Sequence, residues 1–127
     1  MTQTHTTAKN TSNSDLDAVI GEWLTLAETA VRLGLSQSKV KQLIGDRKLI
    51  AVKRDRVPMV PAIFLTGHEV VKGLSGTLTL LADAGFGEDE ALRWLFTADD
   101  TLPGTPAQAL AENRGTEVRR RAQALAF

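Results

Sequence analysis

Two short clusters of polar and basic side chains hold the residue types in this chain that could do chemistry. The first cluster consists of Ser36, Gln37, Ser38, Lys39, Lys41 and Gln42, and the second of Lys53, Arg54 and Arg56. Gln and Lys side chains can hydrogen-bond to base edges, and hydroxyl and cationic side chains can contact phosphate oxygens. We therefore interpret both clusters as candidate contacts to double-stranded DNA.

The sequence before the first cluster predicts a short helix and a tight turn. Thr25 and Glu28 have the spacing of a capping box, in which each side chain satisfies a free backbone N–H at a helix start. Apolar residues at helical spacing extend this helix over about residues 26–33, and Gly34 ends it. Residues 15–23 lead into it as a short helix or an extended segment.

A second helix over residues 37–45 carries the first cluster itself. Ser36 is a favourable N-cap for it. Val40, Leu43 and Ile44 form the apolar stripe, which leaves the polar cluster on the outside. Taken alone, that outer face is equally well explained as an ordinary solvated helix surface.

The second cluster lies between two β-rich runs. Residues 49–52 and 57–60 predict two short strands, with residues 53–56 as the charged turn between them. Pro58 and Pro61 predict that the second strand lies at a sheet edge. Two helices joined by a tight turn and followed by a basic hairpin have the order of a winged helix-turn-helix.

The charge distribution supports this interpretation although the formal net charge is zero. Residues 22–57 hold eight basic and four acidic residues, a net charge of +4, whereas residues 58–127 hold six basic and nine acidic residues, a net charge of −3. The positive charge therefore gathers on the segment that carries both clusters.

We divide the 127 residues into a polar tail (1–14), a winged helix-turn-helix (15–65) and a C-terminal helical region (66–127). The fold class is mainly α with a small β-hairpin wing. Thr6, Thr7 and Thr11 in the tail are candidate phosphoacceptors, because a phosphate would add negative charge beside a basic domain. A featureless polar leader is the alternative.

The C-terminal region predicts further helices over about residues 70–84, 88–97, 106–113 and 115–126, with a loop at 98–106. The helix that starts the region would have Val70 and Val71 in its first turn. In the last helix, Val118, Ala122 and Leu125 would pack inward. Three consecutive arginines, 119–121, point in different directions there, so we favour a solvated helix face over a DNA contact.

The sequence does not favour an enzyme, and we expect no catalytic residue, cofactor or metal. His5 lies in the tail and His68 stands alone, most simply as a cap or surface residue before a helix. The glycines lack phosphate-loop spacing, and no cysteine is present. An apolar run near the ~18 residues of a membrane span is also missing. We expect a cytoplasmic, nucleoid-associated protein without a membrane partner.

The stretch LGLSQSKVKQLIGDRKLIAVKR resembles the MerR and excisionase-like winged-helix group. The later stretches VVKGLSGTLTLLADAGF, ALRWLFT and EVRRRAQALAF are similar to an actinobacterial family of small winged-helix DNA-binding proteins, described in mycobacteria as substrates of a eukaryotic-type Ser/Thr kinase. This resemblance covers about residues 24–127. It implies sequence-specific or architectural DNA binding through residues 36–42 and 53–56, and a Ser/Thr protein kinase as a partner that weakens binding by phosphorylating a tail threonine. We interpret the chain as a DNA-binding protein with a role in transcription regulation.

The C-terminal half supports a different hypothesis. A tryptophan-bearing helix, the GTPAQAL segment and a final helix are similar to the toxin-binding domain of certain antitoxins. A protein-binding adaptor that uses this region is therefore the alternative function. The sequence shows no heptad seam or other dimer element, so it leaves the oligomeric state open.

Overall fold

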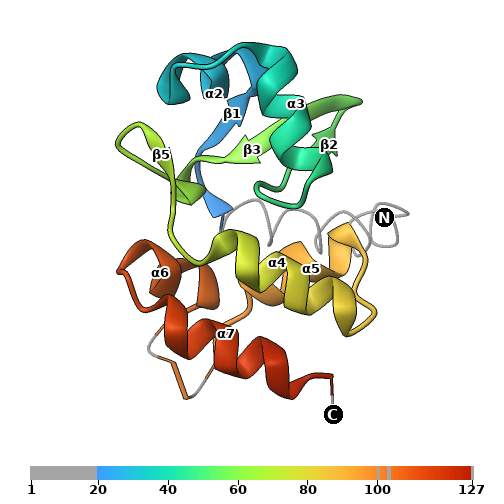
Figure 1. The fold of residues 1–127 in the computed structure, drawn as a ribbon, viewed down its shortest axis with the longest axis vertical. Coiled ribbons are helices and arrows are strands. Elements are labelled where there is room, and N and C mark those ends of the chain that lie inside the picture. Colours follow the sequence, from blue (N-terminus) through green and yellow to red (C-terminus); the bar gives the residue numbers. More distant parts are fainter. Residues whose placement is uncertain (1–19, 100, 103, 127) are drawn as a thin grey trace, which may run out of the picture.

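The computed structural model describes residues 20–99, 101–102 and 104–126; the predicted tail and residues 15–19 lie outside this part of the chain. Its first half contains β1 (Trp23–Thr25), α2 (Leu26–Leu33), α3 (Gln37–Gly45), β2 (Val52–Arg54) and β3 (Val57–Pro61). A 3-10 turn, η1 (Ala62–Phe64), and a hairpin of β4 (Leu65–Thr66) and β5 (Glu69–Val70) lead into the second half. There α4 (Leu74–Asp83), α5 (Glu88–Leu95), α6 (Pro106–Ala111) and α7 (Gly115–Ala124) form a helical layer beside the winged helix-turn-helix (Figure 1).

Both predicted helices of the helix-turn-helix are confirmed, together with their caps. The Thr25 hydroxyl accepts a hydrogen bond from the Glu28 N–H at 3.0 Å, and the Glu28 carboxylate accepts one from the Thr25 N–H at 2.8 Å. Gly34 ends α2 in the left-handed region, at a φ of +68°. The Ser36 hydroxyl then caps α3 by accepting from the Lys39 N–H at 3.1 Å. Each bond satisfies a donor that the helix itself cannot.

The prediction of an edge position for β3 is wrong. The sheet has the order β1-β3-β2, so β3 is its central strand, and the lead-in segment contributes the third strand as β1. The prolines are accommodated because the two neighbours pair with different parts of β3. Pro58 is opposite Lys53 of β2 and Pro61 is opposite Trp23 of β1, whereas Met59 has a partner on both sides.

The hairpin of the wing is shifted and tighter than predicted. The first strand is Val52–Arg54, not residues 49–52, and only Asp55 and Arg56 form the turn. Both turn residues have a positive φ, 53° and 69°, as a two-residue hairpin turn of the mirror-image type requires. The sequence lacks the Asn-Gly or Asp-Gly pair that normally signals such a turn.

The β4–β5 hairpin replaces the predicted start of the next helix. Val70 ends β5 and is opposite Leu65, and Val71 follows it as a buried residue before α4 begins at Leu74. His68 accordingly lies in the hairpin turn and not before a helix. Short strands of two residues give too little alternation to be recognised from sequence.

The other C-terminal helices lie where the sequence predicts them, with ends two residues earlier than expected. The inward packing of Val118 and Ala122 is confirmed, but Leu125 is 42% exposed because α7 ends at Ala124. The segment before α6 is a loop as predicted, and within it Leu102 is fully buried and pairs with Asp99 in a β-bridge.

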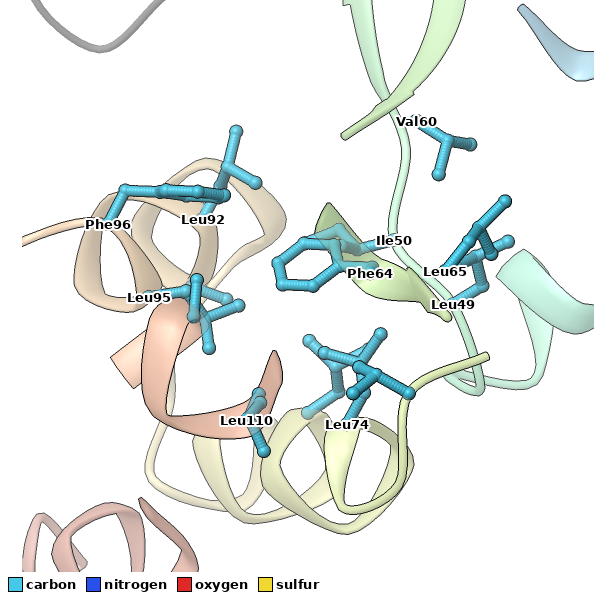
Figure 2. Packing of buried hydrophobic residues seen from close by; sticks show 14 of the residues in the cluster. Leu49, Ile50, Val60, Phe64, Leu65, Leu74, Leu92, Leu95, Phe96 and Leu110 are labelled. Atoms are coloured by element: carbon cyan, nitrogen blue, oxygen red, sulfur yellow. The ribbon is translucent and has the colours of Figure 1, made fainter. Parts of the chain in front are cut away.

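One apolar core joins the two halves, and Phe64 lies at its centre (Figure 2). The ring of Phe64 is fully buried and lies 5.6 Å from the ring of Phe96, centroid to centroid. Figure 2 shows side chains of α5 on one side of Phe64 and Leu49, Leu65 and Val60 of the winged half on the other. The helical layer is thus packed directly against the helix-turn-helix.

We expect Phe64→Ala to lower the free energy of unfolding by about 3–5 kcal/mol, because it leaves a cavity where both halves meet. Phe86→Ala, at a half-buried position, should cost less. Unfolding in denaturant measures this free energy. The fluorescence of Trp23 or of Trp94 reports the transition, each in a variant whose other tryptophan is replaced by Phe. The two reporters should give one shared transition; separate transitions would show that the halves do not share a core.

Candidate nucleic-acid interface

The outer face of α3 presents the first candidate cluster to solvent. Val40 is fully buried and Leu43 and Ile44 are half-buried, which fixes the rotation of the helix. The remaining side chains of the cluster are exposed: Gln37, Ser38, Lys39, Lys41 and Gln42. These are the donors and acceptors that a helix in a major groove uses toward bases and phosphates.

Ser36 is exposed too, but its hydroxyl oxygen already serves as the α3 cap. Its O–H remains able to donate a hydrogen bond to a phosphate oxygen. The position of this residue at the helix N-terminus, where backbone N–H groups point outward, favours contact with an anion.

The second cluster is divided between two faces of the wing. Lys53 on β2 and Arg56 in the turn are exposed. Arg54 is half-buried, and its guanidinium carbon lies 4.7 Å from the centroid of the Trp23 ring, a cation–π contact. Consecutive residues of a strand point to opposite faces. The predicted turn at residues 53–56 contained all three cations and so did not distinguish Arg54 from Lys53 and Arg56.

A groove of about 510 Å³ brings the two clusters together. Lys41 of α3 and Lys53 of β2 both line it, on a floor formed by apolar residues such as Leu26 and Ile44. The helix and the wing therefore present their cations to the same space. A ligand that follows this groove would meet both.

Two acidic residues that we predicted to lie at a solvated helix start also line this groove. Glu88 and Asp89, in the first turn of α5, come from the helical layer. Their negative charge marks the edge of the basic surface on the side of the C-terminal half. No pattern in the sequence links them to the helix-turn-helix, because the approach depends on how the two halves pack.

The arginines of α7 are not part of this surface. Helix α7 lies at the opposite end of the molecule from α3 (Figure 1). Arg121 donates to the hydroxyl of Thr101 at 2.7 Å and to its carbonyl at 3.1 Å. Hydrogen bonds from Thr101, aided by the charge of Arg121, hold the pKa of the Asp99 carboxyl below its usual value. Arg121 is thus a half-buried clamp on this loop and not the solvated residue predicted.

Among the described residues, His68 contacts the helix-turn-helix through α2. Its Nδ1 lies 3.0 Å from the carbonyl oxygen of Arg32 in the last turn of α2. Within the described part of the chain, no group of three acidic, His or Cys residues could hold a metal ion. Nor is any helix there long and apolar enough to cross a membrane.

We expect Arg54→Ala to change the fluorescence of Trp23 and to lower stability by about 0.5–2 kcal/mol, because the stacked guanidinium is lost. Arg56→Ala, an exposed cation in the adjacent turn, is the matched control and should do neither. The measurement uses a Trp94→Phe background, so that Trp23 is the only tryptophan. Equal responses of the two variants would contradict the assigned role of Arg54.

Comparison with known proteins places both halves of the chain. Residues 11–65 match the family described as "DNA-binding protein Rv2175c, wHTH domain", and residues 71–126 match "Rv2175c C-terminal domain of unknown function". The chain is 39% identical over 115 residues to the DNA-binding protein Rv2175c of Mycobacterium tuberculosis (strain ATCC 25618 / H37Rv), covering 80% of this chain and 79% of the relative. It also resembles the NMR structure of Rv2175c, with a TM-score of 0.77 and 37% identity over 84% of this chain and 82% of that one. The chain belongs to the family of the mycobacterial protein Rv2175c.

Proposed function

We propose that this chain binds double-stranded DNA and regulates transcription, with α3 in the major groove and the wing along the phosphate backbone. The observation that carries the proposal is the groove in which Lys41 of α3 and Lys53 of the wing meet. The relative Rv2175c, at 39% identity, is named a DNA-binding protein, which supports the same function here. A protein with this function would be cytoplasmic and associated with the nucleoid.

The contacts divide into two kinds. On α3, Gln37, Gln42 and Lys41 face bases and neighbouring phosphates, and the Ser36, Ser38 and Lys39 side chains contact the backbone. On the wing, Lys53 and Arg56 neutralise phosphates. We assign Arg54 a positioning role, because its stack on Trp23 holds β2 against the rest of the sheet.

Most of the affinity should be electrostatic, since phosphate contacts release counterions from DNA. We expect Lys53→Ala and Arg56→Ala each to weaken binding to all sequences and to flatten the salt dependence by about one unit. Arg120→Ala, an exposed arginine on α7, is the matched control and should change neither. A salt titration against a mixed duplex pool measures both quantities; equal effects of the three substitutions would refute the proposed face.

Sequence preference should depend on α3. We expect Gln42→Ala to relax base preference while it leaves the salt dependence unchanged, because a neutral side chain releases no counterion. Selection of bound sequences from a random duplex pool, with Arg56→Ala as the comparison, measures the preference. A Gln42 variant that selects the same sequences would assign base recognition to other residues.

We further propose that a eukaryotic-type Ser/Thr kinase controls binding through the N-terminal tail. The candidates Thr6, Thr7 and Thr11 lie outside the described residues. The proposal depends on the resemblance to the actinobacterial kinase substrates and on the charge of the interface. A phosphate adds nearly two negative charges, which compete with DNA phosphates for the same cations. We also propose, from the sequence resemblance alone, that the helix-turn-helix is related to the MerR group.

We expect the double substitution Thr6→Asp and Thr7→Asp to weaken salt-dependent binding to the mixed duplex pool. Asn at the same two positions is the control, because it changes the side chains without adding charge. Equal binding by both versions would exclude these two sites and leave Thr11 to be tested in the same way. Failure of the unmodified protein to bind at low salt would favour the protein-binding adaptor instead.

A further inference from the structure

The outward face of α2 carries an apolar stripe. Val31 is 80% exposed and Leu35, in the turn that follows the helix, is 38% exposed. Ala27 is exposed one turn before Val31. Ala27 and Val31 are spaced four apart within α2, so they lie in one row along the helix surface. Leu35 follows Gly34, which ends the helix in the left-handed region, and adds apolar surface after the end of this row. A β-branched apolar side chain with four-fifths of its surface in water is unfavourable unless something covers it.

The side of α2 that faces away from this stripe packs into the fold. Leu26, Thr29 and Ala30 are buried on the opposite side, where the helix packs against α3, β1, β3 and β5. The apolar stripe is therefore not needed to hold the described residues together. It is available to a partner.

The charges beside the stripe indicate which partner fits. Glu28 lies toward the N-terminal end of α2 and Arg32 toward its C-terminal end, on the same flank of the stripe. A two-fold axis perpendicular to α2 would bring a second copy of the helix alongside in antiparallel orientation, with Glu28 of each copy opposite Arg32 of the other. The same arrangement sets Val31 of one copy against the small Ala27 of the other.

We propose that this face is a contact between two copies of the chain. The surface is self-complementary in charge and in side-chain size, as an isologous contact requires. Capping leaves the Glu28 carboxylate available, because one of its oxygens accepts from the Thr25 N–H and the carboxylate has further acceptor sites. DNA phosphates would be repelled by Glu28 and gain nothing from Val31.

The contact is small, so we expect it to form only between copies that are already bound close together on DNA. Two turns of one helix cover far less than the about 800 Å² per partner of a stable interface. Copies held on neighbouring sites of one duplex reach an effective concentration in the mM range, which is enough for a weak contact to form. This step depends on the proposed function: a pair of copies on DNA would read more base pairs than one winged helix can.

The absence of cysteine from the sequence allows a direct test. Val31→Cys is treated with a short bifunctional maleimide on long duplexes that hold several copies and on duplexes of roughly one helical turn, about 10 bp, that hold one. We expect about tenfold more cross-linked dimer on the long duplex. Leu125→Cys, at a position 42% exposed in the opposite half of the molecule, is the control and should give no increase from the short to the long duplex.

Each outcome decides the proposal. Equal cross-linking at both positions, or none at residue 31 while DNA is bound, overturns the contact and leaves DNA binding intact. If the protein binds no duplex, the proposed function fails. The α2 contact is then tested by cross-linking at high protein concentration without DNA. More cross-linked dimer from Val31→Cys than from Leu125→Cys supports the contact, and equal amounts overturn it.

A second variant separates this contact from a contact with DNA. Val31→Gln removes the apolar surface without adding charge, and Leu125→Gln is its control. We expect Val31→Gln to abolish cooperative binding to the long duplex and to leave affinity for the short duplex unchanged. Weaker binding to the short duplex would show that α2 touches DNA, and the proposal would be wrong.

Discussion

Burial of Phe64 is the constraint on which the arrangement of the two halves depends. The 3-10 turn that carries it follows β3 directly, so the strand that supports the wing also delivers the central side chain of the core. Its contact with Phe96 fixes α5 relative to the sheet. Leu49 and Ile50, just after α3, are buried in the same cluster. The orientation of α3 is therefore determined by packing against the helical layer as well as by its own turn.

The same packing gives the basic surface its boundary. Lys41 and Lys53 meet in a groove whose other side is the first turn of α5, with Glu88 and Asp89. A duplex in this groove gains from the cations and is repelled where it approaches the acidic turn. In the proposed complex, the C-terminal half would contribute negative charge at the border of the groove through Glu88 and Asp89. Its clamp at Arg121 and Thr101 lies at the other end of the molecule and serves the fold.

The three cations of the wing differ in their surroundings. A run of three cations among four residues suggests a continuous phosphate contact, yet the pleat of β2 turns Arg54 toward Trp23. This contact ties β2 to β1 across the central strand, since β1 and β2 both pair with β3. Lys53 and Arg56 then have a fixed platform from which to reach a partner.

What the sequence by itself determined was local. The capping box at Thr25, the Ser36 cap and the exposed face of α3 depend on hydrogen bonds and periodicity within one or two turns of chain, so residue types and spacing specify them. The central place of β3, the stack of Arg54 on Trp23 and the acidic edge from Glu88 were decided only by the tertiary structure. Each joins segments far apart in the chain, and which of them meet depends on how the single core packs, a quantity that no short window of sequence contains.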